Sequence, residues 1–163
     1  YTYNDGEEKS ADITKSDAGI SGPELAKAHI RLGEILGEQI PFNPSDTTIV
    51  AIMRGGIFFA QGIYFSLGCK FQLYYPKKEP FIRPDTKNVL LVDSVINTGK
   101  TIKEILTPDM KLACCVIHEN AAAEFGEQLY TVRISKNSFV GTEVKKQTGV
   151  VGPDTTMRLF HQI

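Results

Sequence analysis

Cysteine and histidine are scarce in this 163-residue sequence, which limits the chemistry that its side chains offer. The three cysteines, Cys69, Cys114 and Cys115, form no Cys-x-x-Cys pair and lie in apolar runs, so we expect buried, reduced thiols. The three histidines are scattered along the chain. Because a zinc cage needs several ligands close together, the sequence argues against a zinc site.

Strong charge of either sign and long apolar runs are also missing. The net charge is −1 and the pI is near 6.3, which argues against a nucleic-acid surface, because such a domain is normally basic. No apolar run reaches the roughly 18 residues that a membrane helix needs. The first residues have no basic leader and no apolar stretch, and the first residue is not Met. We therefore expect a cytoplasmic protein, numbered from inside its natural chain, that contacts neither nucleic acid nor membrane.

Continuously apolar, β-branched runs alternate with segments that have the apolar spacing of helices. The expected strands lie at 48–53, 69–75, 88–93, 112–117 and 129–134, and the expected helices at 22–40, 57–67, 100–107 and 119–125. Strands that are apolar throughout are typical of parallel sheets, which are covered on both faces. We therefore predict one α/β domain over residues 1–163, a parallel sheet flanked by helices with a loop-rich C-terminal hood.

Two local signals concern the N-terminal part. Alternating polar and apolar residues around the turn at 4–6 predict a short hairpin within 1–13. Ser21 and Glu24 have the spacing of a capping box, so Ser21 is the expected N-cap of the first helix.

The clearest motif runs from Val89 to Thr101. Four apolar residues bring Asp93 to the carboxyl end of a predicted strand, where parallel α/β sheets bind ligands. The turn at 97–101 then opens a helix, and its N–H groups and hydroxyls suit a phosphate, while Asp93 suits ribose hydroxyls. A P-loop is disfavoured, because Ser94 stands where that motif needs glycine. A strand end and a helix cap without any ligand is the remaining alternative.

This segment resembles the signature with which type I phosphoribosyltransferases bind PRPP (5-phosphoribosyl 1-diphosphate). The resemblance implies that Asp93 contacts the ribose. The residues implied in ribose and 5′-phosphate binding are Asp93, Ser94, Asn97, Thr98, Gly99, Lys100 and Thr101. Most members carry two adjacent acids, whereas here Ser94 takes the second position. Uracil phosphoribosyltransferases also lack the second acid.

A second loop, Arg54-Gly55-Gly56, follows the strand expected at 48–53. Paired glycines let backbone approach a ligand closely, and Arg54 suits a phosphate, although a plain strand-to-helix turn is the alternative. The loop resembles the pyrophosphate loop of the uracil enzymes, and the family implies a cis peptide next to Arg54. Lys77 and Lys78 lie in a polar loop that either closes over the pyrophosphate or is simply solvated.

The third element, residues 149–160, resembles the uracil-recognition loop. Asp154, Arg158, Leu159 and Phe160 fall in register with that loop, whereas Pro153, Thr156 and Met157 depart from it. The resemblance implies that Val151, Gly152 and Asp154 bind the base. The alternative is a C-terminal tail that packs Leu159 and Phe160 on the core.

Together these resemblances imply transfer of the phosphoribosyl group of PRPP to a nucleobase, with uracil favoured and Asp93 and Arg54 as catalytic residues. Mg²⁺ is the implied cofactor, held mainly by PRPP near Asp93 without dedicated protein ligands. Two alternatives stay open, namely transfer to orotate or a purine, and a regulator that binds PRPP without turnover. Ser94 favours the regulator. Because dimers are common in the family, we expect a homodimer.

Overall fold

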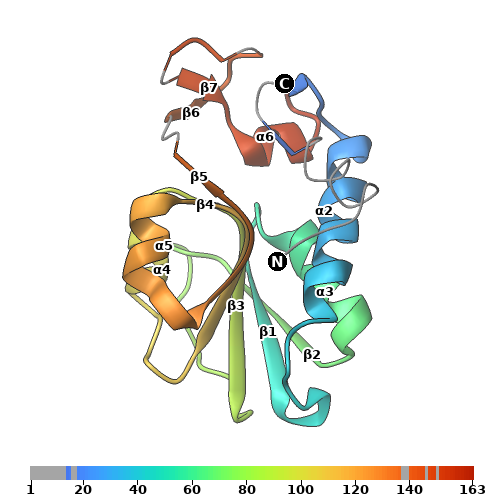
Figure 1. Cartoon of the computed structure of the whole chain (residues 1–163), viewed down its shortest axis with the longest axis vertical. Helices are drawn as coiled ribbons and strands as arrows, with labels where there is room; N and C mark the ends of the chain where they lie inside the picture. Colours follow the sequence, from blue (N-terminus) through green and yellow to red (C-terminus); the bar gives the residue numbers. More distant parts are fainter. Residues whose placement is uncertain (1–13, 16–17, 137–139, 146, 150) are drawn as a thin grey trace.

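The computed structural model describes residues 14–15, 18–136, 140–145, 147–149 and 151–163. The hairpin expected within 1–13 lies outside the described residues. The described chain forms one large sheet with helices on both faces and a small C-terminal unit above one edge of the sheet (Figure 1). This arrangement confirms the predicted α/β architecture.

Five parallel strands form the large sheet, in the order β2-β1-β3-β4-β5. They are β1 (Thr47–Ile52), β2 (Lys70–Tyr74), β3 (Asn88–Ile96), β4 (Lys111–His118) and β5 (Leu129–Ser135). Each predicted strand is present, and every residue of β1 is buried, as expected for a strand inside a covered parallel sheet. Because the strands are parallel, their carboxyl ends meet at one edge, and this edge faces the C-terminal unit.

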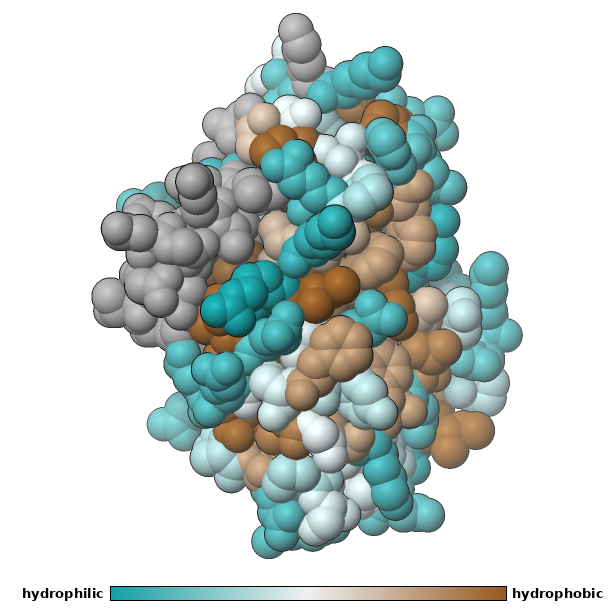
Figure 2. Space-filling view, turned by 90° about the vertical axis from the view of Figure 1, so that its right-hand side faces the viewer, coloured by the Kyte–Doolittle hydropathy of each residue, from teal (hydrophilic) through white to brown (hydrophobic). Residues whose placement is uncertain are grey.

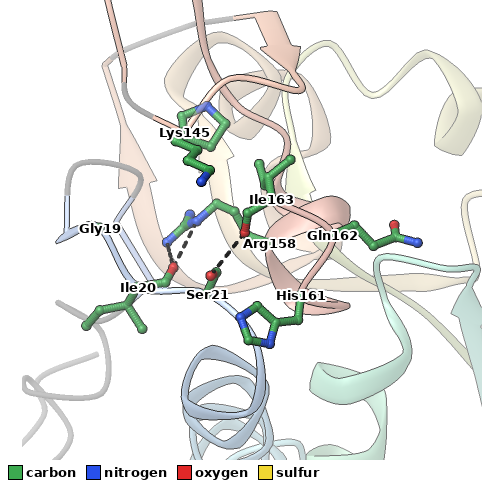
Figure 3. Close-up of a pocket in the computed structure, with 9 residues that line it drawn as sticks. Gly19, Ile20, Ser21, Lys145, Arg158, His161, Gln162 and Ile163 are labelled. Carbon is green, nitrogen blue, oxygen red and sulfur yellow. Dashed lines mark hydrogen bonds between the residues drawn. The ribbon is translucent and has the colours of Figure 1, made fainter.

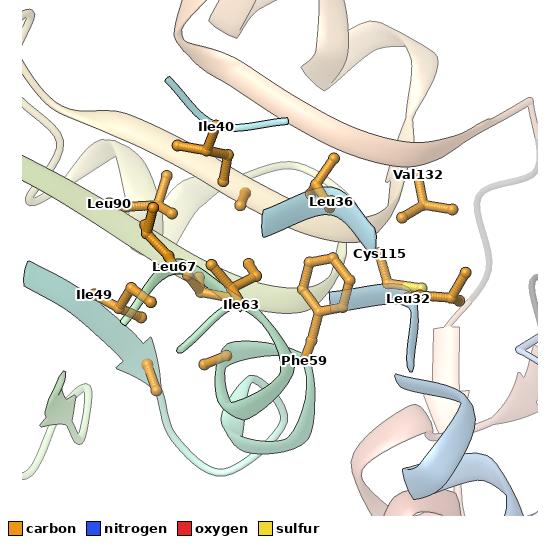
Figure 4. Packing of buried hydrophobic residues seen from close by; sticks show 14 of the residues in the cluster. Leu32, Leu36, Ile40, Ile49, Phe59, Ile63, Leu67, Leu90, Cys115 and Val132 are labelled. Atoms are coloured by element: carbon orange, nitrogen blue, oxygen red, sulfur yellow. The ribbon is translucent and has the colours of Figure 1, made fainter. Parts of the chain in front are cut away.

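Helices cover both faces of the sheet. On one face lie α2 (Pro23–Gly37) and α3 (Ile57–Leu67), and on the other lie α4 (Lys100–Lys103) and α5 (Glu119–Phe125) (Figure 1). Two short 3₁₀ helices, η2 (Pro44–Asp46) and η3 (Gly126–Gln128), precede β1 and β5. In the first layer, side chains of α2 and α3 pack on the sheet (Figure 4), among them Leu32, Leu36, Phe59 and Ile63 against Ile49 and Leu90.

Glycines let α2 and α3 approach closely. A Cβ atom on Gly33 would collide with the carbonyl oxygen of Phe59, and one on Gly62 would collide with the carbonyl oxygen of Ile30. Figure 2 views the molecule from the side of these helices, where apolar and polar side chains are interspersed over the surface. The close packing ties α2 to the sheet through α3.

The first helix does not begin as predicted. Gly22, with a φ of 74°, is the N-cap of α2, and no side chain caps the helix. The Ser21 hydroxyl instead donates to the carbonyl oxygen of Ile163 at 3.3 Å. The N–H of Gly22 donates to the carbonyl oxygen of Arg158 at 2.6 Å. The capping-box prediction is wrong, because contacts with the distant C-terminal segment decide this turn.

The helix predicted at 100–107 is also shorter than expected, since α4 ends at Lys103. Pro108 disfavours a helical conformation at Thr107. The Thr107 hydroxyl donates to Asp109 at 2.5 Å and accepts a hydrogen bond from Arg83, which also pairs with Asp109. The segment after α4 is therefore held by side-chain contacts in place of helical turns.

The C-terminal unit, called the hood below, comprises β6 (Val140–Thr142), β7 (Val151–Pro153) and α6 (Thr155–Leu159). The two strands pair in parallel. Arg158 anchors the hood, because its buried guanidinium donates to the carbonyl oxygens of Thr14 at 3.3 Å, Lys15 at 3.1 Å and Ile20 at 3.0 Å. The predicted hood is present, and Arg158 joins it to the N-terminal segment.

The three cysteines are buried and free, as predicted. Burial raises the pKa of Cys115 to about 12, so its thiol stays protonated. Among the helices of the described residues, none is long and apolar enough to cross a membrane.

Candidate functional site

Two adjoining cavities lie where the carboxyl edge of the sheet meets the hood. The first has a volume of about 130 Å³ and is lined by Gly55, Asp93, Ser94, Val95, Asn97, Gly141, Asp154, Thr155 and Thr156. The second, of about 170 Å³, is lined by Asp93 and by residues 95–102. Asp93 borders both cavities. Three segments that are far apart in the sequence therefore meet around one carboxylate.

Asp93 lies near the end of β3 and is half-buried. Its Oδ1 atom accepts a hydrogen bond from the N–H of Ser94 at 2.7 Å. Burial raises the pKa of Asp93 to about 7, because desolvation of the carboxylate outweighs that hydrogen bond. No lysine or arginine is among the described residues that line the first cavity. Asp93 is thus ready to accept hydrogen bonds from ligand hydroxyls or to face a cation.

Ser94 points to the other side of β3, because successive side chains of a strand alternate. Its side chain is buried, and its Oγ atom lies 2.6 Å from Nε2 of His29. Nδ1 of His29 lies 3.0 Å from the carbonyl oxygen of Leu25, which can only accept, so Nδ1 carries the proton and the Ser94 hydroxyl donates to Nε2. Only the backbone of Ser94 can line the cavity.

Sequence reasoning missed His29, which is fully buried on α2. Burial lowers the pKa of His29 to about 4, so the imidazole is neutral at physiological pH. Its position within an apolar helical face was the one available signal, and such a position does not reveal a partner on β3.

The loop at 97–101 takes its shape from Gly99, and its contact with a phosphate stays a prediction. Gly99 has a φ of 73°, and a Cβ atom there would lie 2.6 Å from the Phe125 ring, so both conformation and space require glycine. The N–H of Lys100 donates weakly to the Thr98 hydroxyl at 3.4 Å. The structure therefore brings Asn97, Thr98, Gly99, Lys100 and Thr101 together beside Asp93, around the second cavity.

The loop at 54–56, called the arginine loop below, contains the expected cis peptide between Met53 and Arg54. A Cβ atom on Gly55 would lie 2.8 Å from Oγ1 of Thr156 and 3.5 Å from Oδ1 of Asp93. A Cβ atom on Gly56 would lie 2.5 Å from the carbonyl oxygen of Val92. Both glycines are needed because the backbone passes close to β3 and the hood.

Arg54 itself lines neither cavity. Its Nη2 atom donates to Oε1 of Gln162 at 3.0 Å, and its Cζ atom lies 4.9 Å from the centre of the Phe160 ring. The structure therefore places the arginine against the C-terminal segment and not beside Asp93.

Lys77 and Lys78 are exposed and also line neither cavity. Their loop is fixed further along by the pairing of Arg83 with Asp109, and by a hydrogen bond from Gln72 to the carbonyl oxygen of Ile82. Contact between the two lysines and a ligand stays a prediction.

Of the three residues implied in base binding, Asp154 alone is among those that line the first cavity. Its Oδ1 atom also caps α6 by accepting from the N–H of Met157 at 3.0 Å. The N–H and carbonyl of Val151 both pair with Thr148, at 3.1 and 2.7 Å, and Val151 is not among the residues that line either cavity. Gly152 pairs with Gly141 of β6. Thr155 and Thr156 line the cavity although the sequence did not single them out as ligand residues.

With this geometry established, the chain can be assigned to the type I phosphoribosyltransferase-like fold. The AQ2163 protein from Aquifex aeolicus superposes with a TM-score of 0.64 at 14% identity, over 82% of this chain and 86% of that chain. A Helicobacter pylori xanthine-guanine-hypoxanthine phosphoribosyltransferase superposes with a TM-score of 0.50 at 17% identity, over 71% of this chain and 84% of that chain. At these identities the likeness concerns the fold.

A curated relative adds a second similarity. The transcriptional regulator GfcR of Archaeoglobus fulgidus is 31% identical over an alignment that covers 44% of this chain and 46% of the regulator. The chain thus matches about half the length of that relative. No family model matches the chain. These similarities do not single out uracil as a substrate.

Proposed function

We propose that this chain is a PRPP-binding sensor domain of a regulator, and that it holds PRPP without transferring its phosphoribosyl group. The observation that carries the proposal is the position of Ser94. The ribose side of the site keeps one carboxylate, Asp93, while the residue that replaces the second acid is buried against His29. The similarity to a transcriptional regulator supports the same conclusion.

The two cavities suit the two ends of a phosphorylated ribose. The loop at 97–101 would surround the 5′-phosphate with backbone N–H groups and the hydroxyls of Thr98 and Thr101. Asp93 would accept hydrogen bonds from the ribose hydroxyls. The site also fits Mg²⁺, because that ion commonly takes one or two carboxylates together with ligand phosphates, and Asp93 and Asp154 line the same cavity. The ion would neutralise diphosphate charge and that of Asp93.

Transfer needs more than this binding. As the C1–O bond of PRPP breaks, positive charge grows on the ribose and negative charge grows on the departing pyrophosphate, and a catalyst needs preorganised groups at both places. Asp93 is available for the ribose. Arg54 is bound by Gln162 and Phe160, and Lys77 and Lys78 lie outside the cavities. Among the described residues, none of these three cations is therefore preorganised at either cavity, and a diphosphate would have to recruit Arg54 from its present partners.

Phosphoribosyl transfer to a nucleobase is the second candidate function, with uracil first and orotate or a purine after it. It is favoured by Asp154, which the hood places in the same cavity as Asp93, where a base would stand above the ribose. In this case Asp93 would stabilise charge at C1 while the base attacks, and Asp154 would hydrogen-bond the base.

One experiment separates the two. We expect calorimetry with Mg²⁺ to show saturable PRPP binding, while a base panel (uracil, orotate, hypoxanthine, guanine, adenine and xanthine) gives no pyrophosphate release. Asp93→Asn should weaken binding about 100-fold, whereas Asp85→Asn, the same change on an exposed loop residue, should leave it unchanged. Pyrophosphate release with any base would overturn the sensor proposal and identify an enzyme. Absence of PRPP binding would overturn both.

A further inference from the structure

We propose that the hood and the arginine loop form a contact that a diphosphate-bearing ligand opens and a plain 5-phosphate ligand leaves closed. This hood–loop contact consists of Arg54 with Phe160 and Gln162, which follow the hood helix α6 directly, and of Gly55 with Thr156 in that helix. The inference rests on the proposed function and adds to it a mechanism by which the site distinguishes PRPP from ribose 5-phosphate and reports the difference.

The partners of Arg54 are a neutral amide and an aromatic ring. A hydrogen bond to a neutral oxygen and an exposed cation–π contact are both weak compared with a charge-assisted, bidentate contact to phosphate oxygens. Arg54 is also exposed, so a ligand can reach it. A diphosphate bound at the arginine loop therefore competes successfully for the guanidinium and withdraws it from Phe160 and Gln162.

In the second half of the contact, the Thr156 side chain lies against the backbone of the arginine loop at Gly55. The point where a Gly55 side chain would begin lies 2.8 Å from the Thr156 hydroxyl and 3.5 Å from the Asp93 carboxylate. Thr156 thus narrows the cavity that Gly55 and Asp93 both line. Because this cavity has a volume of only about 130 Å³, a diphosphate that reaches Gly55 from Asp93 displaces Thr156, whereas a ligand whose phosphate stays in the loop at 97–101 leaves it in place.

Both halves of the contact belong to one face of α6. Thr156 and Phe160 are four residues apart, and the N–H of Phe160 donates to the carbonyl oxygen of Thr156 at 3.1 Å. Residues at this spacing lie one above the other on a helix. When the diphosphate displaces Thr156 and removes Arg54 from Phe160, α6 loses both of its contacts with the arginine loop, while the Phe160 ring keeps its contact with Phe58 of α3 at 5.3 Å between the ring centres.

Release of α6 reaches the N-terminal part of the chain through Arg158. Its guanidinium donates to the carbonyl oxygen of Ile20 (Figure 3) and to that of Thr14. The carbonyl oxygen of Arg158 accepts from the N–H of Gly22 at the start of α2. Because these bonds join α6 to α2, a shift of α6 changes the start of that helix. The hood–loop contact therefore couples diphosphate binding to the surface formed by α2 and the N-terminal segment.

The chain contains no tryptophan, so a single substitution provides a fluorescent reporter. In the Phe160→Trp variant we expect PRPP with Mg²⁺ to change the emission and ribose 5-phosphate to leave it unchanged, although calorimetry detects both ligands. A matched reporter, Phe65→Trp, lies at an exposed site of α3 and should respond to neither. Equal responses of the Phe160→Trp variant to the two ligands would overturn the inference.

A second variant tests the contact by affinity. Gln162→Ala removes the hydrogen-bond partner of Arg54, so PRPP affinity should rise about fivefold and ribose 5-phosphate affinity should stay the same. Gln39→Ala, a change of the same type on the exposed surface, should alter neither. Failure of the proposed function would appear as absence of PRPP heat in the unmodified protein. Failure of the inference alone would appear as PRPP heat without an emission change in the Phe160→Trp variant.

Discussion

The two sides of the site are built in different ways. On one side, β3 and the loop at 97–101 rest on a buried parallel sheet, and their shape follows from local features such as the conformation of Gly99. On the other side, the hood has a two-stranded sheet and one short helix, and it is held by side-chain contacts with distant segments. We expect the side built on the buried sheet, where the proposed complex would hold the 5′-phosphate, to be the rigid side, and the hood side to be the adjustable one.

The largest effect on the difference between the two sides is expected from Arg158→Leu, which removes the main side-chain anchor of the hood. The change would remove the hydrogen bonds that the guanidinium donates to the carbonyl oxygens of Thr14, Lys15 and Ile20, and with them a buried, hydrogen-bonded charge. We expect the free energy of unfolding to fall by about 4 kcal/mol, or the hood to unfold separately. Urea unfolding measures the first, and hydrogen exchange of residues 151–163 measures the second. Arg31→Leu, at an exposed position of α2, should change stability by less than about 0.5 kcal/mol.

The pH dependence of stability tests the rigid side. Folding raises the pKa of Asp93 from 3.8 to about 7. Between pH 3.8 and pH 7 the folded state therefore binds more protons than the unfolded state, so the free energy of unfolding falls as the pH rises through this range. Asp93→Asn removes that penalty. We expect the variant to gain about 2 kcal/mol relative to the wild type between pH 4 and pH 8, less than the full shift implies, because solvent reaches the half-buried carboxylate. Thermal unfolding at several pH values would show it, and parallel profiles would contradict it.

A pair of glycine substitutions measures how tightly the phosphate loop is held. Gly99→Ala meets a left-handed conformation and the Phe125 ring at 2.6 Å, whereas Gly68→Ala meets a similar φ with nothing within 4 Å. We expect costs of about 3 and about 1 kcal/mol, so that the difference reports the clash with Phe125. Equal losses in denaturant unfolding would show that the loop moves freely away from α5. PRPP affinity should fall in the Gly99→Ala variant alone.

The smallest expected effect on binding comes from Ser94→Ala. The change leaves Nε2 of buried His29 without its donor, so stability should fall by about 1 kcal/mol. PRPP affinity should change less than about twofold, because the Ser94 side chain lies outside both cavities. Calorimetry would decide between this result and the larger loss expected if Ser94 contacted the ligand directly.

Much of the fold could be predicted because its signals are local. The apolar runs of β1, β3 and β4 are long enough to require burial on both faces, and this requirement selects a parallel sheet with helices on either side. The positions of Asp93 and Gly99 followed from the end of one strand and the start of one loop. Side-chain alternation along β3 would also have predicted that Ser94 and Asp93 lie on opposite faces of the strand, although it could not have identified His29 as the partner of Ser94.

The C-terminal half of the site was less predictable because it depends on pairings between remote residues. Arg54 meets Gln162 over a separation of 108 residues, and Arg158 meets Ile20 over 138. The hydrophobic periodicity of a sequence does not predict which remote residues will pair. The capping-box prediction at Ser21 failed for the same reason, since the C-terminal segment takes the Ser21 hydroxyl as a donor.

The parallel α/β sheet, the acid at the end of β3 and the glycine-dependent loop beside it can thus be predicted from the sequence alone, since each follows from burial or backbone conformation within a few residues. The contacts of Ser94 with His29, of Arg54 with Phe160 and of Thr156 with Gly55 become visible only in the folded chain. Those contacts depend on how the hood is placed over the sheet, and its placement is set by hydrogen bonds across almost the whole length of the chain.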